Sequence, residues 1–259
     1  GPWNRVHGRF NSVAQLLANR GYIVYEPNFR ASTGFGKTYM LSSNRDFGDG
    51  RVQQDIIDGT KYLLKRGVGH PDKLAVFGHS FGGFSTMAAL AFTPEMFQVG
   101  IAGAPPPSLS RTMKYYMEKQ DQTRAGVLRA EIMALLAVDI NDATDVERLY
   151  NQSPMKHVDK VTKPMYIVAG EKDRRVDILD VREYAIKLEA NRVKVGMLTD
   201  KNEGHNFRKP LATEAYFYLL ETVLAHHLQG RHQPITERKL ERYLNKNMVM
   251  GELPTTPSR

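Results

Sequence analysis

The sequence predicts an α/β protein with a mainly parallel sheet flanked by helices. Strand-like and helical segments alternate along the 259 residues, which is typical of such folds. Five short apolar runs rich in β-branched and aromatic residues predict strands at residues 22–29, 73–77, 97–104, 164–170 and 193–199. A serine between two glycines directly follows one of these runs and precedes a helical pattern, which indicates a tight strand–helix turn.

The remaining segments indicate how the domain is organised. Helices are expected over residues 11–20, 52–66, 81–92, 178–190 and 211–228. Residues 105–163 break the alternation with three prolines and irregular helical patterns, so we interpret them as a helical insertion over one edge of the sheet. We therefore expect one domain over residues 1–228 and a peripheral C-terminal tail over residues 229–259.

Composition excludes several classes of protein. Hydrophobic residues make up 41% of the chain and charged residues 25%, which suits a globular protein. The absence of cysteine excludes disulfides and thiol catalysis, and no apolar run approaches the ~20 residues of a membrane helix. The formal charge is +8, but basic and acidic residues are interleaved, so neither a nucleic-acid nor a membrane partner is expected. Nothing in the sequence selects a cellular compartment.

The serine turn carries the main chemical signal. Gly78-His79-Ser80-Phe81-Gly82 is a G-x-S-x-G pattern between a predicted strand and a predicted helix, the context of a nucleophile elbow in the α/β-hydrolase fold. In such a turn the serine hydroxyl projects above the sheet, and side chains at Gly78 and Gly82 are expected to collide with neighbouring backbone. The alternative is a glycine-rich turn without chemistry.

Two further strand ends supply partners for this serine. A serine hydroxyl needs a base, and the fold places an acid and then a histidine later in the chain. Asp173 follows the strand at 164–170, and His205 follows the strand at 193–199. Because parallel strands end at one edge of the sheet, we expect Ser80, Asp173 and His205 to meet there as nucleophile, orienting acid and general base.

Each partner has rivals in the sequence. Asp177 and Glu171 flank Asp173 and are alternative acids, although Asp173 lies at the better distance past the strand. The other histidines considered, His79, His157, His226 and His227, lie inside the elbow, the insertion or the last helix.

The backbone N–H of Phe81 is the expected first donor of an oxyanion hole, and a second donor is expected from the loop after the third strand of the fold. No metal or organic cofactor is needed for this chemistry.

The motifs resemble a known family. GHSFGG at 78–83, GEKDRRV at 170–176 and EGHNF at 203–207 are similar to the catalytic domain of the prolyl oligopeptidase family of serine peptidases, and NFRASTGFGKTY at 28–39 is similar to a further stretch of it. The resemblance covers residues 1 to about 228. It implies an α/β-hydrolase domain that cleaves peptide bonds of oligopeptides through an acyl-enzyme. It also implies that Asp55 braces the loop after Arg30.

The resemblance suggests three substrate-binding residues. Asn151 resembles an asparagine that holds a substrate carbonyl in dipeptidyl peptidases of the family, but an asparagine before Ser153-Pro154 also suits a turn. Tyr115 and Tyr116 fall where the family places aromatic residues around a proline-sized pocket. Aromatic residues of a helical insertion are otherwise expected in the core.

The resemblance also implies more strands than these five. We expect N-terminal strands, with the second oxyanion donor, to lie outside the present residues. A peptide is the expected partner, and an open sheet edge would favour homo-oligomers. A carboxylesterase on the same fold is the alternative function, because fold does not fix the substrate. A non-catalytic interaction domain is a third interpretation.

Overall fold

The computed structural model describes residues 2–43, 45–119 and 139–255. Its helices are α1 (Ser12–Asn19), α2 (Lys37–Leu41), α3 (Arg51–Lys65), α4 (Phe81–Phe92), α5 (Leu109–Lys119), α7 (Ala143–Asn151), the 3-10 helix η1 (Pro154–Lys160), α8 (Ile178–Ala190), α9 (Pro210–Leu228) and α10 (Arg238–Asn247). Its strands are β1 (Ala75–His79), β2 (Val99–Gly103), β3 (Met165–Gly170), β4 (Val195–Asp200) and β5 (Met248–Met250). Helices and strands alternate from α3 to α9, as the sequence predicts.

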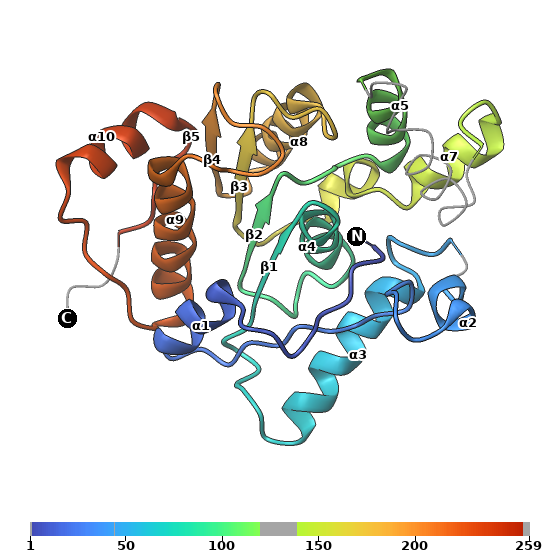
Figure 1. Ribbon diagram of the computed structural model, residues 1–259, viewed down its shortest axis with the longest axis horizontal. Coiled ribbons are helices and arrows are strands. Elements are labelled where there is room, and N and C mark those ends of the chain that lie inside the picture. Colours follow the sequence, from blue (N-terminus) through green and yellow to red (C-terminus); the bar gives the residue numbers. More distant parts are fainter. Residues whose placement is uncertain (1, 44, 120–138, 256–259) are drawn as a thin grey trace.

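The five strands form one sheet in the order β1-β2-β3-β4-β5 (Figure 1). Strands β1 to β4 are parallel, with Phe77 opposite Ile101 and Ile167 opposite Met197, whereas β5 runs antiparallel to β4. Four of the predicted strands are thereby confirmed. Because β1, β3 and β4 run in the same direction, the loops after them leave the sheet at one edge.

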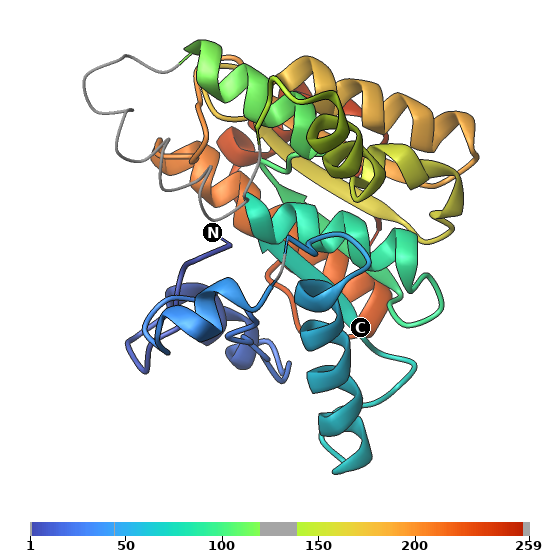
Figure 2. The same cartoon turned by 90° about the vertical axis from the view of Figure 1, so that its right-hand side faces the viewer.

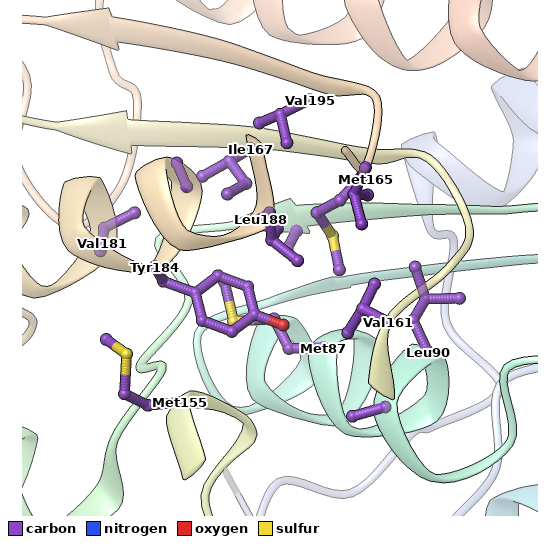
Figure 3. Close-up of a cluster of buried hydrophobic side chains, with 14 of the residues drawn as sticks. Met87, Leu90, Met155, Val161, Met165, Ile167, Val181, Tyr184, Leu188 and Val195 are labelled. Carbon is purple, nitrogen blue, oxygen red and sulfur yellow. The ribbon is translucent and has the colours of Figure 1, made fainter. Parts of the chain in front are cut away.

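Two layers of helices cover the sheet. On one face, α4, α8 and η1 pack on alternate strand residues, including Met165, Ile167 and Val195 (Figure 3). On the other face, α1, α9 and α10 pack on the intervening residues, including Tyr166 and Val168. This period of two follows from the alternation of side chains along a strand, and it explains why β2, β3 and β4 are buried throughout.

The strand predicted at 22–29 is wrong. These residues join no sheet and lie in the N-terminal region, drawn in blue at the lower left of Figure 2. Side chains hold the end of this segment: Tyr39 Oη donates to Asn28 O at 2.7 Å, and Asp55 holds the following Arg30 by accepting from its N at 2.7 Å and its Nη2 at 2.6 Å. A strand exists only where its backbone meets a second strand, and no described segment pairs with this one. The predicted brace by Asp55 is confirmed.

The C-terminal tail is not peripheral throughout. Leu240 and Leu244 of α10 are 5% and 3% exposed and belong to the core on the α9 face, and β5 extends the sheet at β4. The structural reason is an apolar stripe on an otherwise charged helix. Of the predicted insertion, α5, α7 and η1 are described, whereas residues 120–138 lie outside the described residues.

None of the helices in the described ranges is long and apolar enough to cross a membrane.

Candidate active site

Ser80 occupies a one-residue turn between β1 and α4. Its backbone has φ 59° and ψ −119°, a conformation that costs an L-residue on the order of 1–3 kcal/mol. Two hydrogen bonds hold it: Ser80 N donates to Gly103 O at 2.8 Å, and Ser80 O accepts from Phe84 N at 3.0 Å. The strained turn therefore connects the sheet directly to the first turn of α4.

The two glycines of the elbow differ. A Cβ at Gly78 would lie 2.3 Å from the backbone C and O of Gly82, so only glycine fits there. A Cβ at Gly82 would meet nothing within 4 Å, so the collision expected at Gly82 is wrong. The reason is that Gly82 faces open space on the first turn of α4, while Gly78 faces that turn.

Asp173 is fixed in the loop after β3. Its side chain is almost fully buried, and Oδ1 accepts hydrogen bonds from the backbone N–H groups of Arg175 (2.7 Å) and Val176 (3.1 Å). Tyr115 Oη donates to the backbone carbonyl of Asp173 at 2.9 Å. The two N–H groups hold Oδ1 in place and leave Oδ2 free to face another group, while the Tyr115 contact fixes the backbone of the loop.

His205 joins the acid to the serine. Its Nδ1 lies 2.7 Å from Asp173 Oδ2, and its Nε2 lies 2.8 Å from Ser80 Oγ. An ionised carboxylate only accepts, so Nδ1 carries the proton and Nε2 is left to accept the serine proton. The structure thus brings together the three residues that the sequence places 93 and 32 positions apart along the chain.

The rival acids have other partners. Asp177 caps α8 by accepting from Leu179 N at 3.0 Å. Glu171 accepts from Arg182 Nη2 at 2.6 Å and from Thr199 Oγ1 at 3.2 Å. Neither carboxylate is within hydrogen-bond distance of His205, so Asp173 is the acid that the geometry selects.

A second histidine, His79, lies beside His205. The rings of His79 and His205 meet edge to face, with 5.3 Å between their centroids. Burial and the neighbouring His205 lower the pKa of His79, which keeps its ring neutral. A neutral ring at this position adds no positive charge beside the imidazole of His205.

Phe81 opens α4, so its backbone N–H belongs to the first turn, where helical N–H groups lack intrahelical acceptors. An N–H at this end of a helix suits a developing negative charge. The Phe81 side chain is buried, stacks on Phe84 at 5.3 Å and meets Phe47 edge to face. The backbone N–H is therefore the one hydrogen-bond donor that Phe81 offers at this turn, and its role in an oxyanion hole stays a prediction.

The predicted substrate-binding residues lie in different surroundings. Tyr115 reaches the Asp173 loop with its hydroxyl, whereas Tyr116 is 6% exposed and belongs to a core cluster with Phe81 and Phe84, which favours the packing interpretation. The backbone carbonyl of Asn151 lies 2.7 Å from His157 Nε2. The ring of His157 packs on Phe92, the last residue of α4. A substrate role for Asn151 stays a prediction.

Sequence reasoning missed Glu203, two residues before the histidine. Its buried carboxylate accepts from Arg208 N at 2.8 Å and from Lys209 N at 3.3 Å, which closes the loop that carries His205. The signal in the sequence was an acid directly before Gly204-His205.

Comparison with known proteins identifies the family of this chain and several relatives. A model of the prolyl oligopeptidase family matches residues 8–230. Dipeptidyl peptidase family member 6 of Caenorhabditis elegans is 32% identical over 238 residues, which are 90% of this chain and 31% of that protein. Dipeptidyl aminopeptidase BIII of Pseudoxanthomonas mexicana is 32% identical over 91% of this chain and 33% of that protein.

The fold has close counterparts among solved structures. The acylaminoacyl peptidase of Pyrococcus horikoshii superposes with a TM-score of 0.76 at 18% identity, covering 94% of this chain and 38% of that one. This likeness establishes the α/β-hydrolase fold. The present chain spans about a third of the length of the curated relatives it matches. With the family model matched from residue 8 to residue 230, the chain belongs to the prolyl oligopeptidase family.

Proposed function

We propose that this protein is a serine peptidase that hydrolyses peptide bonds of oligopeptides through an acyl-enzyme intermediate. The observation that carries the proposal is the continuous hydrogen-bonded path from Asp173 Oδ2 through the imidazole of His205 to Ser80 Oγ. Membership of the prolyl oligopeptidase family supports peptides as the substrate class.

Each residue has one role in the proposed reaction. His205 Nε2 takes the proton of Ser80 as the hydroxyl attacks the scissile carbonyl, and it returns that proton to the leaving amine. Asp173 keeps the imidazole in the required tautomer and stabilises the imidazolium. The N–H of Phe81 donates to the oxyanion of the tetrahedral intermediate. Water then attacks the acyl-enzyme with His205 again as the base, which releases the acid product.

Hydrolysis of chromogenic amides tests the proposal. Dipeptidyl and N-acyl-aminoacyl p-nitroanilides are suitable substrates, because relatives carry names of dipeptidyl peptidases and acyl-amino-acid-releasing enzymes. Ser80→Ala should lower kcat on the order of 10⁶-fold, since the nucleophile is lost. Ser85→Ala is the matched control, because Ser85 is a buried serine of α4, the helix that follows Ser80, and its hydroxyl has no partner among the described residues.

A p-nitrophenyl ester distinguishes the alternative function. Turnover of amides that depends on Ser80 supports a peptidase. Turnover of the ester alone, with every amide inert, would contradict the peptidase and leave an esterase on the same site. Equal losses in the Ser80 and Ser85 variants would contradict the assigned nucleophile.

A further inference from the structure

The loops that carry Asp173 and His205 are joined to each other at their bases. The backbone carbonyl of Asp200, the last residue of β4, accepts from Glu171 N at 3.0 Å and from Glu203 N at 3.2 Å. The carbonyl of Glu203 accepts from Lys172 N at 2.8 Å. A shift of the β4 end would therefore move both loops, and with them the distance between carboxylate and imidazole.

The side chain of Asp200 is held in turn by the C-terminal tail. Asp200 is 6% exposed, and its Oδ1 accepts from Asn202 N at 2.7 Å. Its Oδ2 accepts from the hydroxyl of Tyr243 in α10. A buried carboxylate needs such donors, because an unpaired charge inside a protein is costly. Burial and this hydrogen bond raise the pKa of Tyr243, so the hydroxyl keeps the proton that it donates.

Tyr243 is itself anchored from both sides. Leu240 precedes it by one turn and Leu244 follows it, and both are buried in the core on the α9 face. Directly after α10, Met248 and Met250 of β5 pair with β4. The tyrosine hydroxyl is thus fixed relative to the strand whose end it contacts, and the tail acts as a rigid support rather than a loose end.

We propose that Tyr243 is a positioning residue for the active site. Through Asp200 it holds the base of the His205 loop in register with the Asp173 loop, and so keeps the imidazole between its two partners. The inference rests on the proposed function, because it assigns the support of that same triad. It gives the tail beyond residue 230, which the family model does not cover, a part in the reaction.

The geometry makes such support consequential. The imidazole contacts Asp173 and Ser80 at 2.7 Å and 2.8 Å, and hydrogen bonds of this kind weaken steeply when distance or angle changes. A displacement of about 1 Å in a catalytic group can cost about 100-fold in rate. Loss of one hydroxyl at the base of the loop should give a smaller displacement and a loss of about tenfold.

The experiment compares Tyr243→Phe with wild type in the full natural chain. Four quantities are measured: kcat and KM on a p-nitroanilide, the rate at which a fluorophosphonate labels Ser80, and Tm. Tyr184→Phe is the matched control, because that buried hydroxyl has no partner among the described residues. Val193→Ala is the stability control, since it removes two buried methyl groups two residues before β4, on the side of the strand opposite Asp200.

The expected result separates positioning from general stability. Tyr243→Phe should lower kcat and the labelling rate about tenfold with KM changed less than twofold, because the nucleophile is activated less well while the binding surface is intact. Tyr184→Phe should leave all four quantities unchanged. Val193→Ala should lower Tm at least as much as Tyr243→Phe does, yet keep the wild-type kcat.

A double variant tests the path through Asp200. Asp200→Ala should reduce kcat at least as much, and combining it with Tyr243→Phe should add little, because the carboxylate that accepts from Tyr243 is already absent. The inference would be overturned if Tyr243→Phe kept the wild-type kcat and labelling rate. It would also be overturned if the losses in kcat simply followed Tm across all variants. Either result would leave the assigned triad intact. Failure of the wild-type protein to be labelled at Ser80 would overturn the proposed function and this inference together.

Discussion

Replacing Asp173 with asparagine should disable the site without changing its shape. The two backbone N–H groups of Arg175 and Val176 both point at Oδ1, so the amide oxygen of an asparagine must take that position. The amide NH₂ then faces His205 Nδ1, which lies 2.7 Å from the present Oδ2. Because NH₂ only donates, Nδ1 must become the acceptor and the imidazole proton moves to Nε2.

A protonated Nε2 faces Ser80 Oγ and cannot take its proton. Such a tautomer change lowers kcat by about 10⁴, which corresponds to about 5.4 kcal/mol in the activation free energy. The assay is steady-state hydrolysis of a p-nitroanilide near neutral pH, with Tm measured alongside to verify folding. KM should change little, since the carboxylate lies behind the histidine.

Asp177→Asn is the control for this prediction. Asp177 caps α8, and asparagine caps helices as well as aspartate does, so both stability and kcat should stay close to wild type. A kcat for Asp173→Asn within about tenfold of wild type, or a larger loss in Asp177→Asn, would refute the assigned orienting acid.

Three further predictions concern stability. Gly78→Ala should lower the free energy of unfolding by roughly 3 kcal/mol or more, because the added Cβ meets backbone atoms. Gly82→Ala should leave the free energy of unfolding unchanged or raise it by up to about 1 kcal/mol, because its Cβ meets nothing. Urea denaturation of the two variants measures the difference. Asp55→Ala should cost about 2 kcal/mol, since Arg30 loses its charged partner; an unchanged denaturation midpoint would contradict this. Burial lowers the pKa of His227 to about 4, below its ordinary value of 6.5. Neutral His227 therefore contributes stability that is fully present above pH 6.5 and is lost as the pH falls towards 4. His227→Phe should flatten the fall in the free energy of unfolding between pH 6.5 and 4, and an unchanged dependence of that free energy on pH would contradict the prediction.

The triad could be predicted from the sequence because its chemistry is local to strand ends. Ser80, Asp173 and His205 each follow a short apolar run, and parallel strands bring their carboxyl ends to one edge. The shared direction of the parallel strands therefore predicts that these three distant residues lie together. The hydrogen bonds that complete the site, such as Tyr115 to the Asp173 carbonyl, depend on how α5 packs, and no local pattern reports that.

The two errors in the fold have different causes. Residues 22–29 have the composition of a strand, but β propensity does not reveal whether a partner strand is present. The many charged residues of the tail favour a peripheral segment. Leu240, Tyr243 and Leu244, at helical spacing, were the signal of a buried stripe, and β5 after them shows that the tail reaches the sheet.

Identification of the residue that reacts with a fluorophosphonate tests the nucleophile most directly. The hydroxyl that His205 activates should form the only stable adduct, so peptide mapping by mass spectrometry should find the added mass on the peptide containing Ser80 and nowhere else. His205→Ala should abolish the adduct while the fold, followed by circular dichroism, is retained. An adduct on another serine, or one that persists in the His205 variant at the wild-type rate, would contradict the account.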